Sequence, residues 1–128
     1  LLLGTRNEAE ACASIVTRLP NNALSLAGRT TIPELAAALD SCALAIANDS
    51  GGMHLAAGVR TPVVGIYGIT DPAKTGPMGQ GHQIVLKDGV VRSRDLQRSS
   101  ERALAALAAI TPEQVVTAAL SILNGQSR

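Results

Sequence analysis

Short runs of apolar residues alternate along the chain with longer segments in which apolar residues recur every three or four positions. The short runs predict buried strands, and the periodic segments predict amphipathic helices. The predicted strands are residues 1–4, 23–26, 42–47, 63–67 and 84–86. The predicted helices are residues 8–18, 32–39, 51–57, 101–109 and 112–123. This alternation predicts an α/β protein with a doubly wound parallel sheet and helices on both faces.

Several helix ends carry recognisable signals. Thr31 and Glu34 stand three residues apart before an apolar run, and so do Thr111 and Gln114. Both pairs have the spacing of a capping box, in which each side chain accepts a hydrogen bond from the other residue's amide. Gly58 follows the short helix predicted for residues 51–57 and is expected to end it in a left-handed conformation.

Two stretches predict loops. Residues 68–81 are rich in glycine and proline, which interrupt regular structure. Residues 87–98 are charged and have no apolar periodicity, so a mobile loop is expected there.

Residues 48–54, with the sequence NDSGGMH, lie between a predicted buried strand and a predicted helix. The first amides of a helix lack partners and carry the positive end of the helix dipole, which favours an anion. Gly51 and Gly52 would let a phosphate approach the backbone closely. In the alternative interpretation, Asp49 or Ser50 simply caps the helix.

The position of this turn in the predicted sheet favours a ligand site. In open parallel sheets, ligands bind beyond the carboxyl ends of the strands. Turns at residues 4–7, 27–31, 48–52 and 68–72 all follow predicted strands, so they are expected at one edge. A site there would consist of backbone amides, small hydroxylated side chains and a few carboxylates.

Composition excludes some classes of function. The 128 residues are expected to form one domain. A net charge of +1 and a single aromatic residue, Tyr67, argue against a nucleic-acid partner, since neither a basic surface nor stacking platforms are present. Cys12 and Cys42 have no metal-ligand spacing and are expected to be reduced, as in a cytosolic protein. No apolar run approaches the roughly 20 residues that span a bilayer.

The sequence provides little for catalysis. His54 is the only histidine near the predicted site, no carboxylate is placed to orient it, and no G-x-S-x-G motif occurs. The dinucleotide motif G-x-G-x-x-G is absent as well. Asp49, Glu8 and Asp71 are better explained as caps, turn residues or partners of sugar hydroxyls than as general bases. We therefore expect a binding site without a catalytic residue, a metal or a cofactor.

Two blocks of the sequence resemble family 9 glycosyltransferases, which are the bacterial ADP-heptose:lipopolysaccharide heptosyltransferases and their relatives. The blocks are NDSGGMHLAA at residues 48–57 and TPVVGIYGITDP at residues 61–72, followed by Gly76-Pro77. Residues 26–35 and 4–8 are similar more weakly. The likeness runs from Leu1 to about Leu123 and corresponds only to the carboxyl-terminal half of such an enzyme. Because the chain begins inside an apolar run and without Met, a piece of a longer protein is expected.

The resemblance implies the GT-B architecture, in which two Rossmann-like domains enclose a cleft. Residues 1–128 would be the domain that binds the nucleotide-sugar donor, ADP-heptose above all. The amino-terminal domain, absent from this chain, would bind a lipid-linked saccharide acceptor and supply the base for an inverting transfer. The enzyme would be cytoplasmic, at the inner face of the bacterial inner membrane, and only the full-length protein would associate with that membrane.

The resemblance also assigns residues to the diphosphate. Ser50, Gly51 and Gly52 would direct their amides to it, and His54 would support the turn or approach the phosphates. No metal is needed for this kind of binding, because helix amides bind phosphate directly.

Three further residues would bind the rest of the donor. Asp49 would accept hydrogen bonds from sugar hydroxyls, Glu8 would bind the ribose, and Thr30 would lie beside the base. Two departures from the family pattern bear on the sugar: Ile69 stands where the family often has proline, and the usual basic residue of the first strand loop would lie upstream of Leu1.

Two other functions fit the same fold. One is a stand-alone nucleotide- or phosphate-binding module without transferase activity. The other is the related half of a nucleotide-sugar 2-epimerase, which matches less well because the D-[ST]-G-x-x-H and G-x-T-D-P blocks are closer to family 9. An upstream Rossmann-like half in the coding sequence would favour the transferase.

Overall fold

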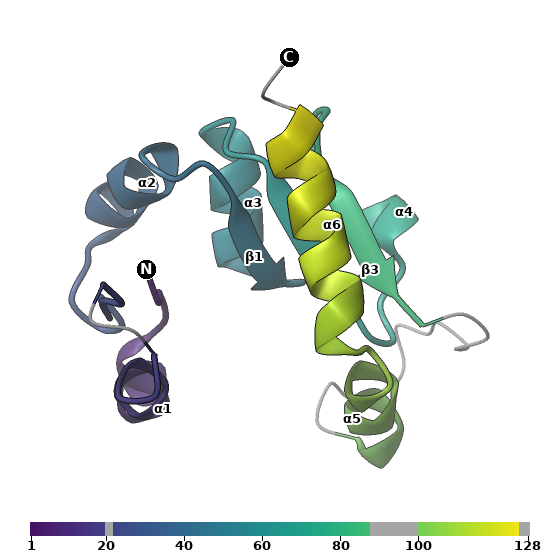
Figure 1. Ribbon diagram of the computed structural model, residues 1–128, viewed down its shortest axis with the longest axis horizontal. Helices are drawn as coiled ribbons and strands as arrows, with labels where there is room; N and C mark the ends of the chain where they lie inside the picture. Colours follow the sequence, from purple (N-terminus) through teal and green to yellow (C-terminus); the bar gives the residue numbers. More distant parts are fainter. Residues whose placement is uncertain (20–21, 88–99, 126–128) are drawn as a thin grey trace. The chain divides into compact units, whose positions relative to one another are not determined.

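The computed structural model describes residues 1–19, 22–87 and 100–125. The chain divides into two compact units, Leu1–Ala38 and Leu39–Arg128. The first contains the short 3₁₀ helix η1 (Arg6–Glu8), helix α1 (Ala9–Val16) and most of α2 (Ile32–Asp40). The second contains the remaining elements, drawn in Figure 1: β1 (Ala45–Asn48), α3 (Gly51–Gly58), β2 (Val63–Tyr67), α4 (Pro72–Thr75), β3 (Gln83–Leu86), α5 (Glu101–Ala108) and α6 (Pro112–Gly125).

The second unit is built on a parallel sheet with the strand order β1-β2-β3. Ala45 pairs with Val63, and Val64 pairs with Gln83, both in parallel register. Helices α3 and α6 lie on opposite faces of this sheet (Figure 1). The parallel α/β architecture with helices on both faces is therefore confirmed.

The side chains of β2 are buried alternately on the two faces of the sheet. Val64 packs with Val85, Ala119 and Ile122 under α6. On the other face, the Tyr67 hydroxyl lies 3.3 Å from the sulfur of Met53 in α3, and both side chains are fully buried. This two-sided burial follows from the continuous apolar sequence of the strand, because a central parallel strand is covered on both faces.

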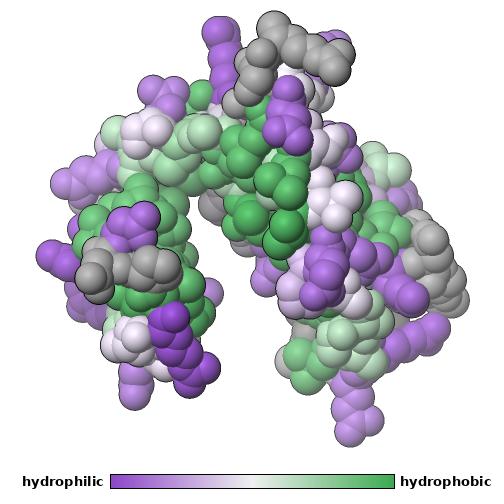
Figure 2. All heavy atoms as spheres, viewed as in Figure 1, coloured by the Kyte–Doolittle hydropathy of each residue, from purple (hydrophilic) through white to green (hydrophobic). Residues whose placement is uncertain are grey.

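The layer under α6 ends short of β1. Ile46 is the register partner of Val64 and therefore lies on the same face, yet it is 53% exposed. Val116, Leu120 and Leu123 of α6 are also exposed, and Figure 2 shows apolar residues gathered over this part of the second unit. Within that unit, α6 thus covers β2 and β3 but leaves part of β1 uncovered.

Gly65 allows α3 to lie close against β2. A Cβ atom there would lie 2.9 Å from Cε2 of Tyr67 and 3.4 Å from the sulfur of Met53. Gly65→Ala is therefore expected to lower the free energy of unfolding by about 1–3 kcal/mol, as overpacking does. At Gly58 an added Cβ would meet no atom within 4 Å, so Gly58→Ala should stabilise the helix by about 0.5–1 kcal/mol. Chemical denaturation of the two variants measures both effects, and equal stabilities would contradict the packing argument.

The end of α3 differs from the prediction for Gly58. That glycine is the last residue of the helix, and the left-handed residue is Arg60, with φ of 66°. The amide of Thr61 donates to the Ala56 carbonyl (3.0 Å), and the amide of Arg60 donates to the Ala57 carbonyl (3.0 Å). These are the two bonds of a Schellman motif, which places the left-handed position two residues beyond Gly58. The buried Thr61 hydroxyl then donates to the Leu39 carbonyl (2.7 Å).

The predicted strands at residues 1–4 and 23–26 shrink to one parallel bridge, between Leu2 and Ser25. The Leu2 amide donates to the Leu24 carbonyl (2.8 Å), and the Leu26 amide donates to the Leu2 carbonyl (2.9 Å). Among the described residues of the first unit, these segments form one bridge with each other, and an isolated two-stranded pair is marginally stable.

Both predicted capping boxes are confirmed. Glu34 accepts from the Thr31 amide (2.8 Å), and Gln114 accepts from the Thr111 amide (2.9 Å). The bonds from Thr31 hold the pKa of the Glu34 carboxyl below its usual value.

The predicted loops have mixed outcomes. The predicted loop at residues 68–81 contains one short helix, α4. Among the predicted strands, the one expected at residues 42–47 begins only at Ala45. The mobile loop predicted for 87–98 lies, after Lys87, outside the described residues. In the described part of the chain no single helix is long and apolar enough to cross a membrane, and α5 and α6 reach that length only as a pair bent by 60°.

Candidate functional site

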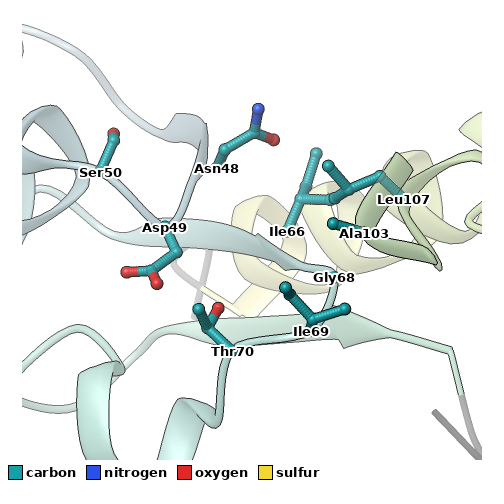
Figure 3. A pocket seen from close by; sticks show the side chains of 9 residues that line it. All are labelled: Asn48, Asp49, Ser50, Ile66, Gly68, Ile69, Thr70, Ala103 and Leu107. Atoms are coloured by element: carbon teal, nitrogen blue, oxygen red, sulfur yellow. The ribbon is translucent and has the colours of Figure 1, made fainter. Parts of the chain in front are cut away.

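A cavity of about 270 Å³ opens at the carboxyl ends of β1 and β2, where parallel sheets bind ligands. Three segments line it: the turn after β1, the end of β2 with the turn that follows it, and one side of α5 (Figure 3). Its residues are Asn48, Asp49, Ser50, Ile66, Gly68, Ile69, Thr70, Ala103 and Leu107. The prediction that the turns at residues 48–52 and 68–72 share one edge is thus confirmed.

At the start of α3, the first amides have no helical hydrogen-bond partner among the described residues. Ser50 occupies the N-cap position with extended backbone (φ −151°, ψ 166°), but its hydroxyl makes no capping bond within the described chain. The first hydrogen bond of the helix runs from the His54 amide to the Ser50 carbonyl (3.4 Å). The amides of Gly51, Gly52 and Met53 therefore precede the helical ladder, as expected of an anion-binding helix start.

The two glycines are not required by the fold of this turn. Both are exposed, and neither has a positive φ. A Cβ atom at Gly51 would meet no atom within 4 Å, and one at Gly52 would meet only Ser50 Oγ, at 3.8 Å. Their small size therefore leaves open space above the helix amides, which is what a phosphate would need.

Asp49 is half-buried and directly precedes Ser50, the N-cap residue of α3. Its Oδ2 lies 3.4 Å from the Thr75 hydroxyl, which donates toward it. Burial raises the pKa of Tyr67, and the negative charge of Asp49 raises it further. Figure 3 shows the Asp49 carboxylate turned to the side of Thr70, while Asn48 points the other way. Asp49 thus lines the cavity, and its carboxylate contacts the segment that follows β2.

Asp71, the third carboxylate considered, is a cap. Its Oδ1 accepts from the Ala73 amide (3.1 Å) at the start of α4, and its Oδ2 lies 3.9 Å from the Lys74 ammonium. The interpretation of Asp71 as a cap is confirmed.

In the first unit, the turn that carries Glu8 and the turn that carries Thr30 lie side by side. The Gly28 amide donates to the Gly4 carbonyl (2.9 Å), and Gly28 has φ of 69°, with a position for an added Cβ that would lie 2.7 Å from Arg6 Cα. Glu8 Oε2 accepts from the hydroxyl and the amide of Thr5, both at 2.7 Å, which lowers the pKa of that carboxyl. Thr30 is half-buried. The ribose and base contacts assigned to these two residues stay predictions.

His54 is exposed on α3, four residues after Ser50. Its assignment to the turn or the phosphates therefore also stays a prediction. Among the described residues no three His, Cys, Asp or Glu side chains are grouped to bind a metal ion.

Sequence reasoning missed the α5 wall of the cavity. Ala103 and Leu107 line the cavity, and a Cβ on Gly68 would lie 3.0 Å from Leu107 Cγ. In the sequence these apolar residues are indistinguishable from core positions of an amphipathic helix. The glycine after β2 was the available signal, because it marks a close approach by another element.

The model for glycosyltransferase family 9 (heptosyltransferase) matches residues 1–104 of this chain. The lipopolysaccharide heptosyltransferase 2 of Salmonella typhimurium is 29% identical over 131 residues, covering 97% of this chain and 37% of that protein. The lipopolysaccharide heptosyltransferase 3 of Escherichia coli K12 is 50% identical over 46 residues, or 36% of this chain and 13% of that protein. The matched part of the chain thus spans little more than a third of the length of the Salmonella protein and 13% of the length of the E. coli protein.

Solved structures agree with this likeness. The ADP-heptose lps heptosyltransferase II of E. coli superposes with a TM-score of 0.80 at 25% identity, covering 99% of this chain and 37% of that one. A family 9 glycosyl transferase from Veillonella parvula gives a TM-score of 0.77 at 26% identity, covering 96% of this chain and 36% of that one. The chain shares the fold of these GT-B enzymes and belongs to glycosyltransferase family 9.

Proposed function

We propose that this chain is the donor-binding domain of a glycosyltransferase that transfers heptose from ADP-heptose to a lipopolysaccharide-core-type acceptor. The observation that carries the proposal is the start of α3. Amides of Gly51, Gly52 and Met53 that precede the helical ladder open beside a cavity that also holds a carboxylate, Asp49. Membership of family 9 and the names of the relatives support heptose as the sugar.

The physical role of this domain in catalysis would be electrostatic. When a glycosidic bond to a nucleotide breaks, negative charge develops on the departing diphosphate. Amides fixed at a helix start stabilise that charge without reorganising, and this kind of preorganised stabilisation is a large term in enzyme catalysis. The acceptor, a lipid-linked saccharide, would be held by another domain, at the cytoplasmic face of the inner membrane.

Calorimetry with ADP, UDP, GDP and ADP-heptose tests the proposal directly. We expect ADP and ADP-heptose to bind and the other two nucleotides to bind more weakly. Binding of every nucleotide with equal affinity, with no gain from the sugar, would instead favour a general nucleotide- or phosphate-binding module.

Asp49→Asn separates sugar binding from capping. Asparagine caps a helix about as well as aspartate, and it preserves the size of the side chain. If Asp49 accepts bonds from sugar hydroxyls, the variant should lose about 10-fold in ADP-heptose affinity and keep its ADP affinity, as loss of a charged acceptor does. Calorimetry with the two ligands measures the difference. Equal losses for both ligands would contradict the sugar contact.

A further inference from the structure

The segment after β2 reaches back to Asp49. Thr75, the last residue of α4, places its hydroxyl oxygen 3.4 Å from Asp49 Oδ2, across 26 positions of sequence. The same hydroxyl lies 3.2 Å from the Asp71 carbonyl oxygen, one helical turn earlier. The hydroxyl proton of Thr75 therefore has two possible acceptors, the Asp49 carboxylate and the Asp71 carbonyl. A charged carboxylate is the stronger acceptor of the two.

The backbone of Thr75 is in turn bound by Tyr67, the only aromatic residue in the sequence. The Tyr67 hydroxyl donates to the Thr75 carbonyl (2.7 Å), and the Tyr67 side chain is fully buried at the end of β2. Its ring packs between the sheet and α3, with Met53 Sδ 3.3 Å from the hydroxyl. Because burial and the charge of Asp49 both raise the pKa of Tyr67, the phenol keeps its proton at neutral pH and remains a donor.

These contacts join three elements around one carboxylate. β2 fixes Tyr67, Tyr67 fixes the backbone of Thr75, and the Thr75 hydroxyl contacts Asp49 at the cavity. A carboxylate has about four acceptor sites, so a donor on one oxygen sets the direction in which the others face a ligand. The α4 turn is held in place for this contact, since its start is capped by Asp71.

We propose that Thr75 is a positioning residue for Asp49, and that Tyr67 fixes Thr75 in that role. The inference rests on the proposed function, because it assumes that Asp49 binds the sugar of the donor. Thr75 itself does not line the cavity, so it would act on the sugar only through Asp49.

Thr75→Val tests the role, since valine has nearly the same shape without the hydroxyl, and Thr75→Ser is the matched control that keeps the hydroxyl. We expect the valine variant to lose about 10-fold in affinity for ADP-heptose with ADP affinity unchanged. The serine variant should bind both ligands like the parent chain. Tyr67→Phe, which removes only the hydroxyl, should shift ADP-heptose affinity in the same direction.

A double-mutant cycle shows whether Thr75 acts through Asp49. In the Asp49→Asn background, Thr75→Val should cause little further loss of ADP-heptose affinity, because coupled residues are not additive. Full additivity, or equal losses of ADP and ADP-heptose affinity in Thr75→Val, would overturn the positioning role while leaving the proposed function intact. Failure of the parent chain to bind ADP-heptose would overturn the proposed function and this inference with it.

Discussion

Gly52→Val is expected to weaken the binding of ADP by about 100-fold, which corresponds to about 3 kcal/mol. Gly52 is exposed at the second position of α3, and a Cβ there would stand in otherwise open space, 3.8 Å from Ser50 Oγ. A branched side chain in that space would keep a diphosphate away from the amides at the helix start. Hydrogen bonds from such amides to a charged oxygen contribute about 1.5–3 kcal/mol each, so losing one or two of them accounts for the effect.

The same substitution at the other end of α3 is the control. Gly58 is also exposed and helical, and a Cβ there would meet no atom within 4 Å. Gly58→Val should therefore bind ADP like the parent chain, and thermal unfolding should show that both variants are folded. Isothermal calorimetry with ADP measures the affinities. An unchanged affinity in folded Gly52→Val would place the diphosphate elsewhere.

Much of the second unit follows from its sequence pattern. The strands at residues 63–67 and 84–86 appear within a residue of their predicted limits, because continuous apolar runs leave few alternatives to a buried parallel strand. The edge of the sheet that holds the cavity follows too, since every parallel strand ends on the same side. The helix start at Ser50 was predicted from its two glycines and its polar neighbours.

Tertiary contacts decided what the pattern missed. The Thr61 hydroxyl donates to the Leu39 carbonyl, 22 positions earlier, and this contact fixes the residue whose amide closes the end of α3, so that the left-handed residue is Arg60 rather than Gly58. The approach of Leu107 to Gly68 and of Thr75 to Asp49 joins residues that lie far apart in the chain. Periodicity describes which side of an element is buried and carries no information about which element buries it.

The capping motifs show the opposite case, in which a local signal is sufficient. Thr31 with Glu34 and Thr111 with Gln114 form the bonds that their spacing predicts. Thr5 and Glu8 have the same spacing and form the same bonds before η1, although Glu8 was assigned to a ribose. The Thr5 amide and hydroxyl both donate to Glu8 Oε2, so a ribose contact by Glu8 would have to coexist with this cap.

The second large effect concerns activity: residues 1–128 alone are expected to transfer no sugar. Inverting transfer needs a base within about 3 Å of the acceptor hydroxyl, on the side of the sugar opposite the departing diphosphate. In the described part of this chain, the carboxylates near the cavity have other roles. Asp71 caps α4, and Asp49 is proposed to bind the donor sugar itself.

The remaining candidate, His54, lies on α3, the helix that would bind the diphosphate, and so stands on the leaving-group side. In a two-domain cleft the base would come from the facing domain, and closure of that cleft would also exclude water. We therefore expect calorimetry to detect donor binding while a radiolabelled heptose assay detects no turnover on a lipopolysaccharide-type acceptor. Joining the amino-terminal half of a family 9 enzyme covalently should restore turnover. Robust transfer by residues 1–128 alone would show that the chain contains a base, with Asp49 and His54 as the first residues to replace.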